Sequence, residues 1–352
     1  MAAFDPKQPS DRRIYLRADM GGYVLGRLRR RQFLISAGAL LATPIASFAQ
    51  QHTRLVRIGV LAVPSASNFA TRTEALRAGL RDFGYVEGKN TLIEFRSAEG
   101  KYDRLPELAA ELVRQNVDVI VAGGTPAIRA AKQATRTVPI VIAAVGDAVA
   151  GGLVASLSRP GGNITGSTYF APELAAKQLE LLKEAFPQTT RVAVVVNPSN
   201  PAMGPAMQAV ESAARSLKLE LEQFAVREPP DFDGAFVTIA KKRYKTALII
   251  DDPITISNAG ALADLAVRHR LATAGFIEYA EAGGLMGYGV NLIALWRRAA
   301  FFVDKILKGT SPGEIPVERS TRFDLIINRK TAKAIQVTIV PSILLRADRV
   351  IE

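Results

Sequence analysis

Short apolar segments alternate with amphipathic segments along most of the chain. The apolar segments are continuous and rich in β-branched residues, a pattern typical of strands buried on both faces of a parallel sheet. In the first half of the chain they cover residues 57–63, 92–95, 117–121 and 140–144. Helical periodicity fills the intervals, over residues 71–83, 104–115 and 127–135. The alternation predicts an α/β fold with helices on both faces of a mostly parallel sheet.

The same alternation restarts near residue 191. Predicted strands cover residues 191–196, 220–225, 247–250 and 272–277, and the predicted helices cover residues 205–217, 232–241 and 258–270. A longer helix is expected over residues 292–308. Because the chain exceeds the usual size of a single core, the two arrays predict two lobes, each built around its own sheet.

Three segments rich in glycine or proline separate these arrays, at residues 159–166, 283–291 and 311–322. If each is a crossover, both lobes are discontinuous in sequence, and three short connections favour hinge bending. We therefore expect two discontinuous lobes. Lobe 1 comprises residues 56–165 and 287–320, and lobe 2 comprises residues 166–286 and 321–352.

A separate apolar segment, RLRRRQFLISAGALLATPIASFAQ, covers residues 27–50. Its uncharged part follows a basic cluster and is too short to span a bilayer, which needs about 20 apolar residues. Ser47 and Ala49 are small residues of the kind that signal peptidase accepts, so residues 1–49 are predicted to be a leader and a signal peptide cleaved after Ala49. The pair Arg30-Arg31 favours twin-arginine export, with Sec export as the alternative. The charged residues upstream suggest that translation starts at Met20.

Composition limits the function of the rest of the chain. The full sequence has 45 basic and 33 acidic residues, and without residues 1–49 there remain 37 and 30, a net charge of +7. The basic residues are dispersed, so nucleic-acid binding is not favoured. There is no cysteine, and the two histidines are His52 and His269, so disulfides, thiol catalysis, a histidine triad and a zinc site are not expected. We expect a soluble exported protein without a metal or cofactor.

Polar turns follow several predicted strands. Thr125-Pro126, Asn200-Pro201 and Asp252-Pro253 each place a helix-capping residue before proline, which marks the start of a helix. Ser65–Asn68 and Gly146-Asp147 form similar polar turns. Ligands of open α/β sheets bind beyond the carboxyl ends of the strands, where free helix N–H groups suit an anion. Each motif alone is explained by capping, but together they predict a cleft without identifying its ligand.

Motifs for catalysis are weak. Gly287-Tyr288-Gly289 lacks the third glycine of a dinucleotide-binding turn, and Gly123-Gly124-Thr125 lacks the lysine of a phosphate-binding loop. Asp251 and Asp252 are adjacent, so in extended chain their side chains point in different directions and do not form an acid/base pair. These observations favour a binding protein over an enzyme.

Six segments carry a resemblance to a known family: RIGVLAVPSASNFAT, FGYVEGKN, LVRQNVDVIVAGGTPAIRAAKQATRTVPIVIAAVGDAVAGGLVASLSRPGGNITG, LELLKEAFP, NPSNP and FDLIINRKTAKAI. Over residues 57–352 the chain resembles the ABC-transporter substrate-binding proteins that bind tryptophan or tyrosine, a branch of the type I periplasmic binding protein fold. The resemblance implies a monomeric periplasmic receptor that captures a small organic solute, such as an amino acid or another carboxylate. It further implies delivery to a membrane permease with its ATPase, no nucleic acid, membrane contact only through the permease, and no catalysis.

By position, the resemblance implies that eleven residues line the ligand site. N–H groups and hydroxyls would bind a carboxylate, Asp147 or Asp252 would bind an ammonium group, and two tyrosines would form aromatic walls near the hinge. The residues are Ser65, Ser67, Gly124, Thr125, Gly146 and Asp147 from lobe 1, Asn197, Asn200 and Asp252 from lobe 2, and Tyr169 and Tyr279 near the hinge.

Two positions depart from the family pattern: Gln336 stands where relatives usually carry glycine, and Val340 where they carry proline. Both place the local turn in question rather than the binding function. Two other functions stay open, an exported receptor for a sensory system and an exported α/β hydrolase or isomerase. The enzyme would need a nucleophile beside a base, which two poorly placed histidines do not supply.

Overall fold

The computed structural model describes residues 55–352, which belong to one compact unit. The predicted signal peptide, its cleavage after Ala49, the twin-arginine pair and the predicted start at Met20 all lie outside the described residues. Among residues 55–352, no helix combines the length and the apolar character that crossing a bilayer requires.

The first sheet has six strands in the order β11-β5-β4-β3-β1-β2, and every neighbouring pair is parallel. The strands are β1 (Val56–Ala62), β2 (Thr91–Ser97), β3 (Val119–Gly123), β4 (Ile140–Val145), β5 (Ile164–Thr168) and β11 (Glu318–Arg319). Strand β4 is buried along its whole length, because helices cover both faces of the sheet. Burial on both faces explains why the central strands β3 and β4 are continuous apolar runs in the sequence.

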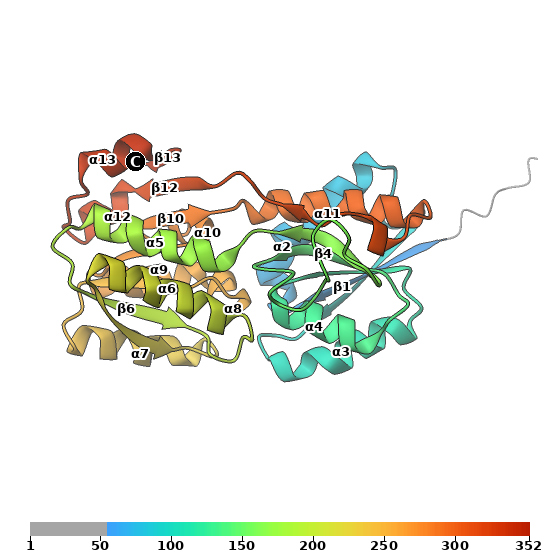
Figure 1. Cartoon of the computed structure of the whole chain (residues 1–352), viewed down its shortest axis with the longest axis horizontal. Helices are drawn as coiled ribbons and strands as arrows, with labels where there is room; N and C mark the ends of the chain where they lie inside the picture. Colours follow the sequence, from blue (N-terminus) through green and yellow to red (C-terminus); the bar gives the residue numbers. More distant parts are fainter. Residues whose placement is uncertain (1–54) are drawn as a thin grey trace, which may run out of the picture. The chain divides into compact units, whose positions relative to one another are not determined.

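Helices α3 (Leu105–Arg114) and α4 (Thr125–Ala134) lie on one face of the first sheet, and α2 (Ala66–Asp82) and α11 (Leu292–Leu307) lie on the other (Figure 1). Successive strand residues point to opposite faces. In β4, Ile142 therefore packs with α3 and α4, whereas Val141 packs with α2 and α11. Gly79 permits the close packing of α2 on α11, because an added Cβ would lie 2.3 Å from the Arg297 carbonyl oxygen. The first sheet and these four helices are called lobe 1.

The second sheet has seven strands in the order β13-β12-β10-β9-β8-β6-β7, and only the β10–β12 pair is antiparallel. The strands are β6 (Arg191–Val196), β7 (Glu220–Ala225), β8 (Thr246–Ile249), β9 (Ala272–Gly275), β10 (Met286–Gly289), β12 (Asp324–Asn328) and β13 (Arg349–Ile351). Val194 of β6 packs with α5 and α6, and Val195 packs with α7 and α9 on the opposite face. The predicted α/β fold with two mostly parallel sheets is confirmed.

The second sheet and the remaining helices are called lobe 2. These helices are α5 (Ala171–Ala185), α6 (Met203–Leu217), α7 (Pro230–Lys241), α8 (Pro253–Ser257), α9 (Ala259–Arg268), α10 (Ile277–Glu281), α12 (Arg329–Ala334) and α13 (Pro341–Arg346). Short 3₁₀ turns at Tyr102–Arg104 and Pro312–Glu314 complete the secondary structure of lobe 1.

The chain passes between the two sheets three times, after β5, after β10 and after β11. Two expected boundaries differ by a few residues, because strand pairing extends further than the sequence pattern indicates. Strand β5 stays paired in the first sheet up to Thr168, and β10 stays paired in the second sheet up to Gly289. The segment 159–166 is therefore not itself a crossover, and the Gly161 N–H instead donates to the Gly313 carbonyl within lobe 1.

Helix α12 ends in a turn that puts Gln336 in the left-handed region, with φ of 61°. The Gln336 N–H donates to the Lys333 carbonyl at 3.2 Å, and the Val337 N–H donates to the Ala332 carbonyl at 3.0 Å. These two bonds define a Schellman motif, in which glycine is the usual residue at the left-handed position. The chain keeps this turn although it carries glutamine there.

Candidate ligand-binding site

A cavity lies between the two lobes, at the carboxyl ends of strands from both sheets. It contains about 680 Å³ of atom-free space, its open mouth included. Lobe 1 contributes Pro64, Phe69, Arg72, Gly123, Gly124, Thr125, Ala144, Gly146, Leu292 and Trp296, lobe 2 contributes Ala171, Asn200, Ala202, Met203, Asp251, Asp252, Pro253 and Ile256, and Tyr169 comes from the connection after β5. The position is the one at which open α/β sheets bind ligands.

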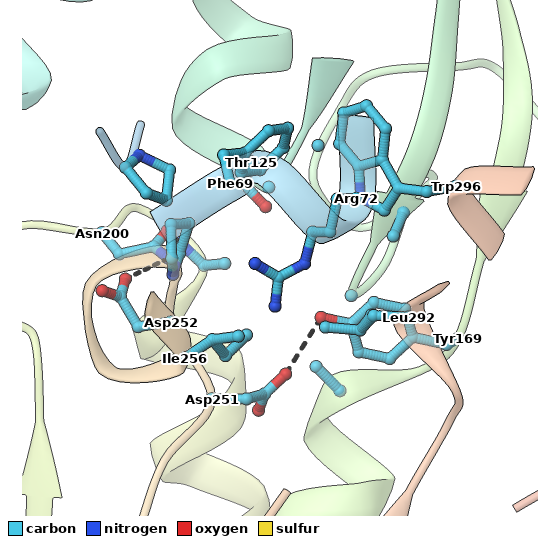
Figure 2. Close-up of a pocket in the computed structure, with 18 of the residues that line it drawn as sticks. Phe69, Arg72, Thr125, Tyr169, Asn200, Asp251, Asp252, Ile256, Leu292 and Trp296 are labelled. Atoms are coloured by element: carbon cyan, nitrogen blue, oxygen red, sulfur yellow. Dashed lines mark hydrogen bonds between the residues drawn. The ribbon is translucent and has the colours of Figure 1, made fainter. Parts of the chain in front are cut away.

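Arg72 points its guanidinium group into the middle of this cavity (Figure 2). Helix α2 places it one turn after Phe69, and the guanidinium carbon lies 5.6 Å from the centre of the Phe69 ring. The residue is 8% exposed and makes no ion pair within residues 55–352. Burial lowers the pKa of Arg72, and the negative charge of Glu278 opposes this shift. A buried cation without a bonded partner is costly, so an anionic ligand group would stabilise this arrangement.

The start of helix α4 adds hydrogen-bond donors to the same cavity. The helix begins at Thr125, and no side chain caps its free N–H groups. Gly124, which precedes it, has φ of 80°, and an added Cβ would lie 2.8 Å from the Pro253 side chain of lobe 2. Glycine is therefore required here for both the backbone conformation and the close approach of the lobes. Together with Arg72, the helix N-terminus makes this side of the cavity suitable for a carboxylate.

Asp252 has all of its hydrogen-bonding capacity occupied by protein groups. Its carboxylate accepts hydrogen bonds from Tyr102 Oη at 2.7 Å, Asn200 Nδ2 at 2.8 Å, Ile254 N at 2.9 Å and Asn197 Nδ2 at 3.1 Å. Burial raises the pKa of Asp252, and the bonds from Tyr102, Asn200 and Asn197 oppose this rise. Because Tyr102 belongs to lobe 1, the bond between Tyr102 and Asp252 joins the lobes directly.

In Asp251, the preceding residue, only one of the two carboxylate oxygens has a hydrogen-bond partner among the described residues. Its Oδ2 accepts a hydrogen bond from Tyr169 Oη at 3.0 Å, whereas its buried Oδ1 has no partner among the described residues (Figure 2). Burial raises the pKa of Asp251 to about 6, although the bond from Tyr169 opposes the rise. The pKa of Tyr169 is raised by its own burial and by Asp251, so this phenol stays protonated as the donor. Asp251 therefore has a free acceptor to offer to a ligand.

Six of the eleven predicted site residues line the cavity, and the structure brings them together from both lobes and the hinge. They are Gly124, Thr125, Gly146, Tyr169, Asn200 and Asp252. Their role in binding stays a prediction. Asn197 does not line the cavity, but it contacts Asp252, which does. Its Nδ2 donates to Asp252 and its Oδ1 accepts from the Ser199 N–H, so it positions Asp252.

The other four predicted residues do not line the cavity. Ser65 is the N-cap of α2, with its Oγ 3.4 Å from the Asn68 nitrogen, and Ser67 lies beside it at the helix start, with the two hydroxyl oxygens 3.1 Å apart. Asp147 uses its Oδ1 to accept hydrogen bonds from the backbone of the turn that follows it, at 2.9 Å from both Val149 N and Ala150 N. These three side chains are engaged in local turns rather than aimed at the cavity.

Tyr279 is placed in the hydrophobic core instead of the predicted aromatic wall. It is fully buried and its hydroxyl donates to Thr273 Oγ1 at 2.8 Å. Its ring covers Gly284, where an added Cβ would lie 2.3 Å from a ring atom. The physical reason is the short helix α10, which begins at Ile277 and turns the side chain back onto β9.

Among the cavity residues that the sequence did not predict are Phe69, Arg72, Asp251 and Trp296. Phe69 and Arg72 are spaced three residues apart, which places them on one face of a helix that begins at Ala66. Because the sequence pattern predicted that this helix starts at residue 71, Phe69 was left out of it. Asp251 could have been found from its position directly after β8. Within residues 55–352, no group of three or more carboxylate, histidine or cysteine side chains is arranged to hold a metal ion.

Two lobes that enclose a cavity with an apolar wall and a few charged and polar groups define a two-lobed ligand-binding protein. The family model for the ABC transporter substrate binding protein matches residues 57–351, so the chain belongs to that family. The family is one of binding proteins, and this chain is accordingly a substrate-binding protein rather than an enzyme.

Similar proteins agree with this assignment. The chain is 28% identical over 258 residues to a tyrosine-binding protein of Clostridioides difficile strain R20291, which covers 73% of this chain and 74% of the relative. Among solved structures, a conserved domain protein from Vibrio cholerae has a TM-score of 0.78 and 28% identity, covering 84% of this chain and 100% of that one. The ABC domain in complex with L-Trp from Streptococcus pneumonia has a TM-score of 0.76 and 24% identity, covering 84% and 99%.

Proposed function

We propose that this protein is the periplasmic solute-binding component of an ABC-type importer. It captures a small organic solute, an amino acid or another carboxylate, and delivers it to a membrane permease with its ATPase. The observation that carries the proposal is the buried guanidinium of Arg72, which lies in the cavity between the lobes without an ion-pair partner among the described residues. Family membership supports the pairing with a permease, and the pattern of residues 27–50 supports export.

In this proposal the solute's carboxylate binds between Arg72 and the N-terminus of α4. The guanidinium supplies charged hydrogen bonds, and the free N–H groups beside Thr125 supply further donors. Asn200 adds a polar contact from lobe 2, and Phe69 and Trp296 form the apolar wall of the cavity. An aromatic amino acid is a reasonable first candidate because of this wall and because one relative is named for tyrosine.

The proposed capture mechanism is closure of the lobes about the three connecting segments. A ligand shifts the equilibrium towards the closed form only as far as it binds that form more tightly than the open one. Arg72 belongs to lobe 1, and Asn200 and Asp251 belong to lobe 2, so a solute that reaches all three residues contacts both lobes. The closed form is then the conformation presented to the permease.

A thermal-shift screen of amino acids, aromatic acids and other carboxylates tests this proposal, since a specific ligand raises the melting temperature by mass action. At least one carboxylate is expected to stabilise the protein. Arg72→Gln is expected to weaken its binding about 10-fold or more, because charged hydrogen bonds are lost. The matched control is Arg81→Gln, on the same helix, whose ion pair with Glu74 is exposed. The proposal fails if no compound binds, or if the Arg72 and Arg81 variants bind the winning compound equally well.

A further inference from the structure

A smaller chamber adjoins the ligand cavity beyond Tyr169 and Asp251. It contains about 260 Å³ of atom-free space, its open edge included. The two spaces share Tyr169, Asp251, Ile256 and Leu292 as lining residues. Helix α5, the start of α10 and the connection between β10 and α11 complete the chamber, so the two spaces are neighbours that share one wall of side chains.

Three buried side-chain oxygens at this chamber have no hydrogen-bond partner among the described residues: Asp251 Oδ1, Glu278 Oε2 and Gln178 Oε1. Buried polar atoms nearly always have a partner, so three of them in one place require an explanation. Gln178 is 2% exposed, and its Nε2 donates to the Tyr288 carbonyl at 2.8 Å, which fixes the orientation of its amide group. All three unpartnered atoms are acceptors, so the missing group is a hydrogen-bond donor.

The charge of the chamber narrows the choice of donor. Burial raises the pKa of both carboxyl groups, to about 6 for Asp251, and the charge of Arg72 opposes the rise for Glu278. Neither carboxylate forms an ion pair with a basic residue within residues 55–352. A positively charged donor would offset the desolvation of both groups and bond to all three oxygens. The geometry therefore favours a cation with several N–H groups over a neutral hydroxyl.

We propose that a primary ammonium group of the ligand binds in this chamber, between Asp251, Glu278 and Gln178. The inference rests on the proposed function and names its substrate class: a zwitterion whose carboxylate lies toward Arg72 and whose ammonium group lies toward the chamber. Carboxylic acids without an amine are then weak ligands, because they leave the three acceptors without a donor other than water.

Matched compounds test this proposal on the unaltered protein. Three sets suffice: L-tyrosine, 3-(4-hydroxyphenyl)propionate and tyramine; L-phenylalanine, 3-phenylpropionate and phenethylamine; and L-tryptophan, indole-3-propionate and tryptamine. Isothermal titration calorimetry is expected to show the amino acid binding about 10-fold or more tightly than either partner of its set. A propionate that binds as tightly as its amino acid overturns the ammonium site.

The outcomes separate this inference from the proposed function. If the wider screen yields only carboxylates that lack an amine, the ammonium site is wrong while the solute-binding function stands. If no compound of the screen binds, the proposed function fails and the inference falls with it.

Glu278→Gln provides a second test, because glutamine keeps the size of the side chain and removes its charge. The variant is expected to lose about 10-fold or more in affinity for the amino acid and to keep its affinity for the matching propionate. Glu281→Gln is the control, since Glu281 lies on the same short helix and pairs with Arg349 at the surface. Equal weakening of both ligands, or no weakening of either, contradicts the assignment.

Discussion

Asp251 and Asp252 are adjacent in sequence and serve different purposes. The backbone at Asp252 is extended, with φ of −153° and ψ of 147°, so neighbouring side chains point to different sides. Asp252 is surrounded by protein donors, whereas Asp251 keeps an unpartnered oxygen. The sequence predicted that the two side chains diverge. It could not predict which of them keeps a free oxygen at the cavity, because that depends on donors from Tyr102, Asn197 and Asn200, which are distant in the chain.

Asp251 should make stability depend on pH in the ligand-free protein. Burial raises the pKa of Asp251 from 3.8 to about 6, and the hydrogen bond from Tyr169 opposes this rise. The negative charge of Asp252 adds to the rise. The other charged groups facing the same space are Arg72 and Glu278. The folded state thus holds this proton more tightly than the unfolded chain, so this contribution to stability falls as pH rises from about 4 to about 6. Asp251→Asn removes the cost of ionisation.

The free energy of unfolding of the Asp251→Asn variant minus that of the unaltered protein should therefore increase by roughly 2 kcal/mol from about pH 4 to about pH 7. Urea unfolding at the two pH values measures this difference. Asparagine can still accept the hydrogen bond from Tyr169, so the comparison isolates the charge. A difference between variant and unaltered protein that does not change with pH contradicts the raised pKa.

At the scale of elements, the alternation of strands and helices along the chain placed several strands correctly. The predicted strands at residues 191–196 and 220–225 coincide with β6 and β7. Short elements were missed, among them α8 and α10 with five residues each, because they are too brief to show helical periodicity. The start of α2 was placed five residues late, since Ser65 was interpreted as part of a polar turn and not as the N-cap that it is.

The Schellman turn after α12 offers a test of local strain. Gln336 adopts φ of 61°, where a side chain other than glycine is strained by roughly 1 kcal/mol. Gln336→Gly should therefore raise the stability by about 1 kcal/mol, which corresponds to a rise in melting temperature of about 2 °C. Differential scanning calorimetry measures the change.

The matched control for this turn is Lys330→Gly, inside the same helix, where glycine should lower the stability by about 1 kcal/mol. The two glycine variants thus have opposite expected signs. A loss of stability in the Gln336 variant contradicts the left-handed turn.

At the scale of the whole molecule, the alternating pattern was enough to predict two lobes joined by three crossovers, although it placed the first crossover at residues 159–166, which lie within lobe 1. It was not enough to predict the contact across the cavity. Tyr102 follows β2 in lobe 1 and Asp252 follows β8 in lobe 2, and no local pattern connects two residues so far apart in sequence. The same limit explains why Trp296, on a helix late in the chain, was not expected beside Phe69, although their ring centres lie 4.8 Å apart.

The bond between Tyr102 and Asp252 should help to hold the lobes closed. Tyr102→Phe removes the hydroxyl, so Asp252 Oδ2 keeps only the hydrogen bond from Asn200. Because this bond joins the lobes, its loss should favour the open form and weaken the binding of the screened ligand about 5- to 10-fold. Isothermal titration calorimetry measures the affinity.

Tyr85→Phe is the matched control for this prediction, since the Tyr85 hydroxyl donates to Asp304 within lobe 1 at 3.2 Å. It should leave affinity unchanged. Equal affinities of the two phenylalanine variants for the ligand would show that the Tyr102 bond does not contribute to closure.

Ligand-dependent closure is the central claim, and small-angle X-ray scattering of the protein with and without its ligand tests it most directly. The ligand is the compound that gives the largest thermal shift in the screen. In this structure the lobes are in contact, since Tyr102 of lobe 1 donates to Asp252 of lobe 2. We expect the free protein to have a larger radius of gyration than residues 55–352 of this structure. The ligand is expected to reduce the radius to the value calculated from the structure. A compound that binds tightly, with Arg72 required, and leaves the scattering curve unchanged would contradict capture by closing lobes.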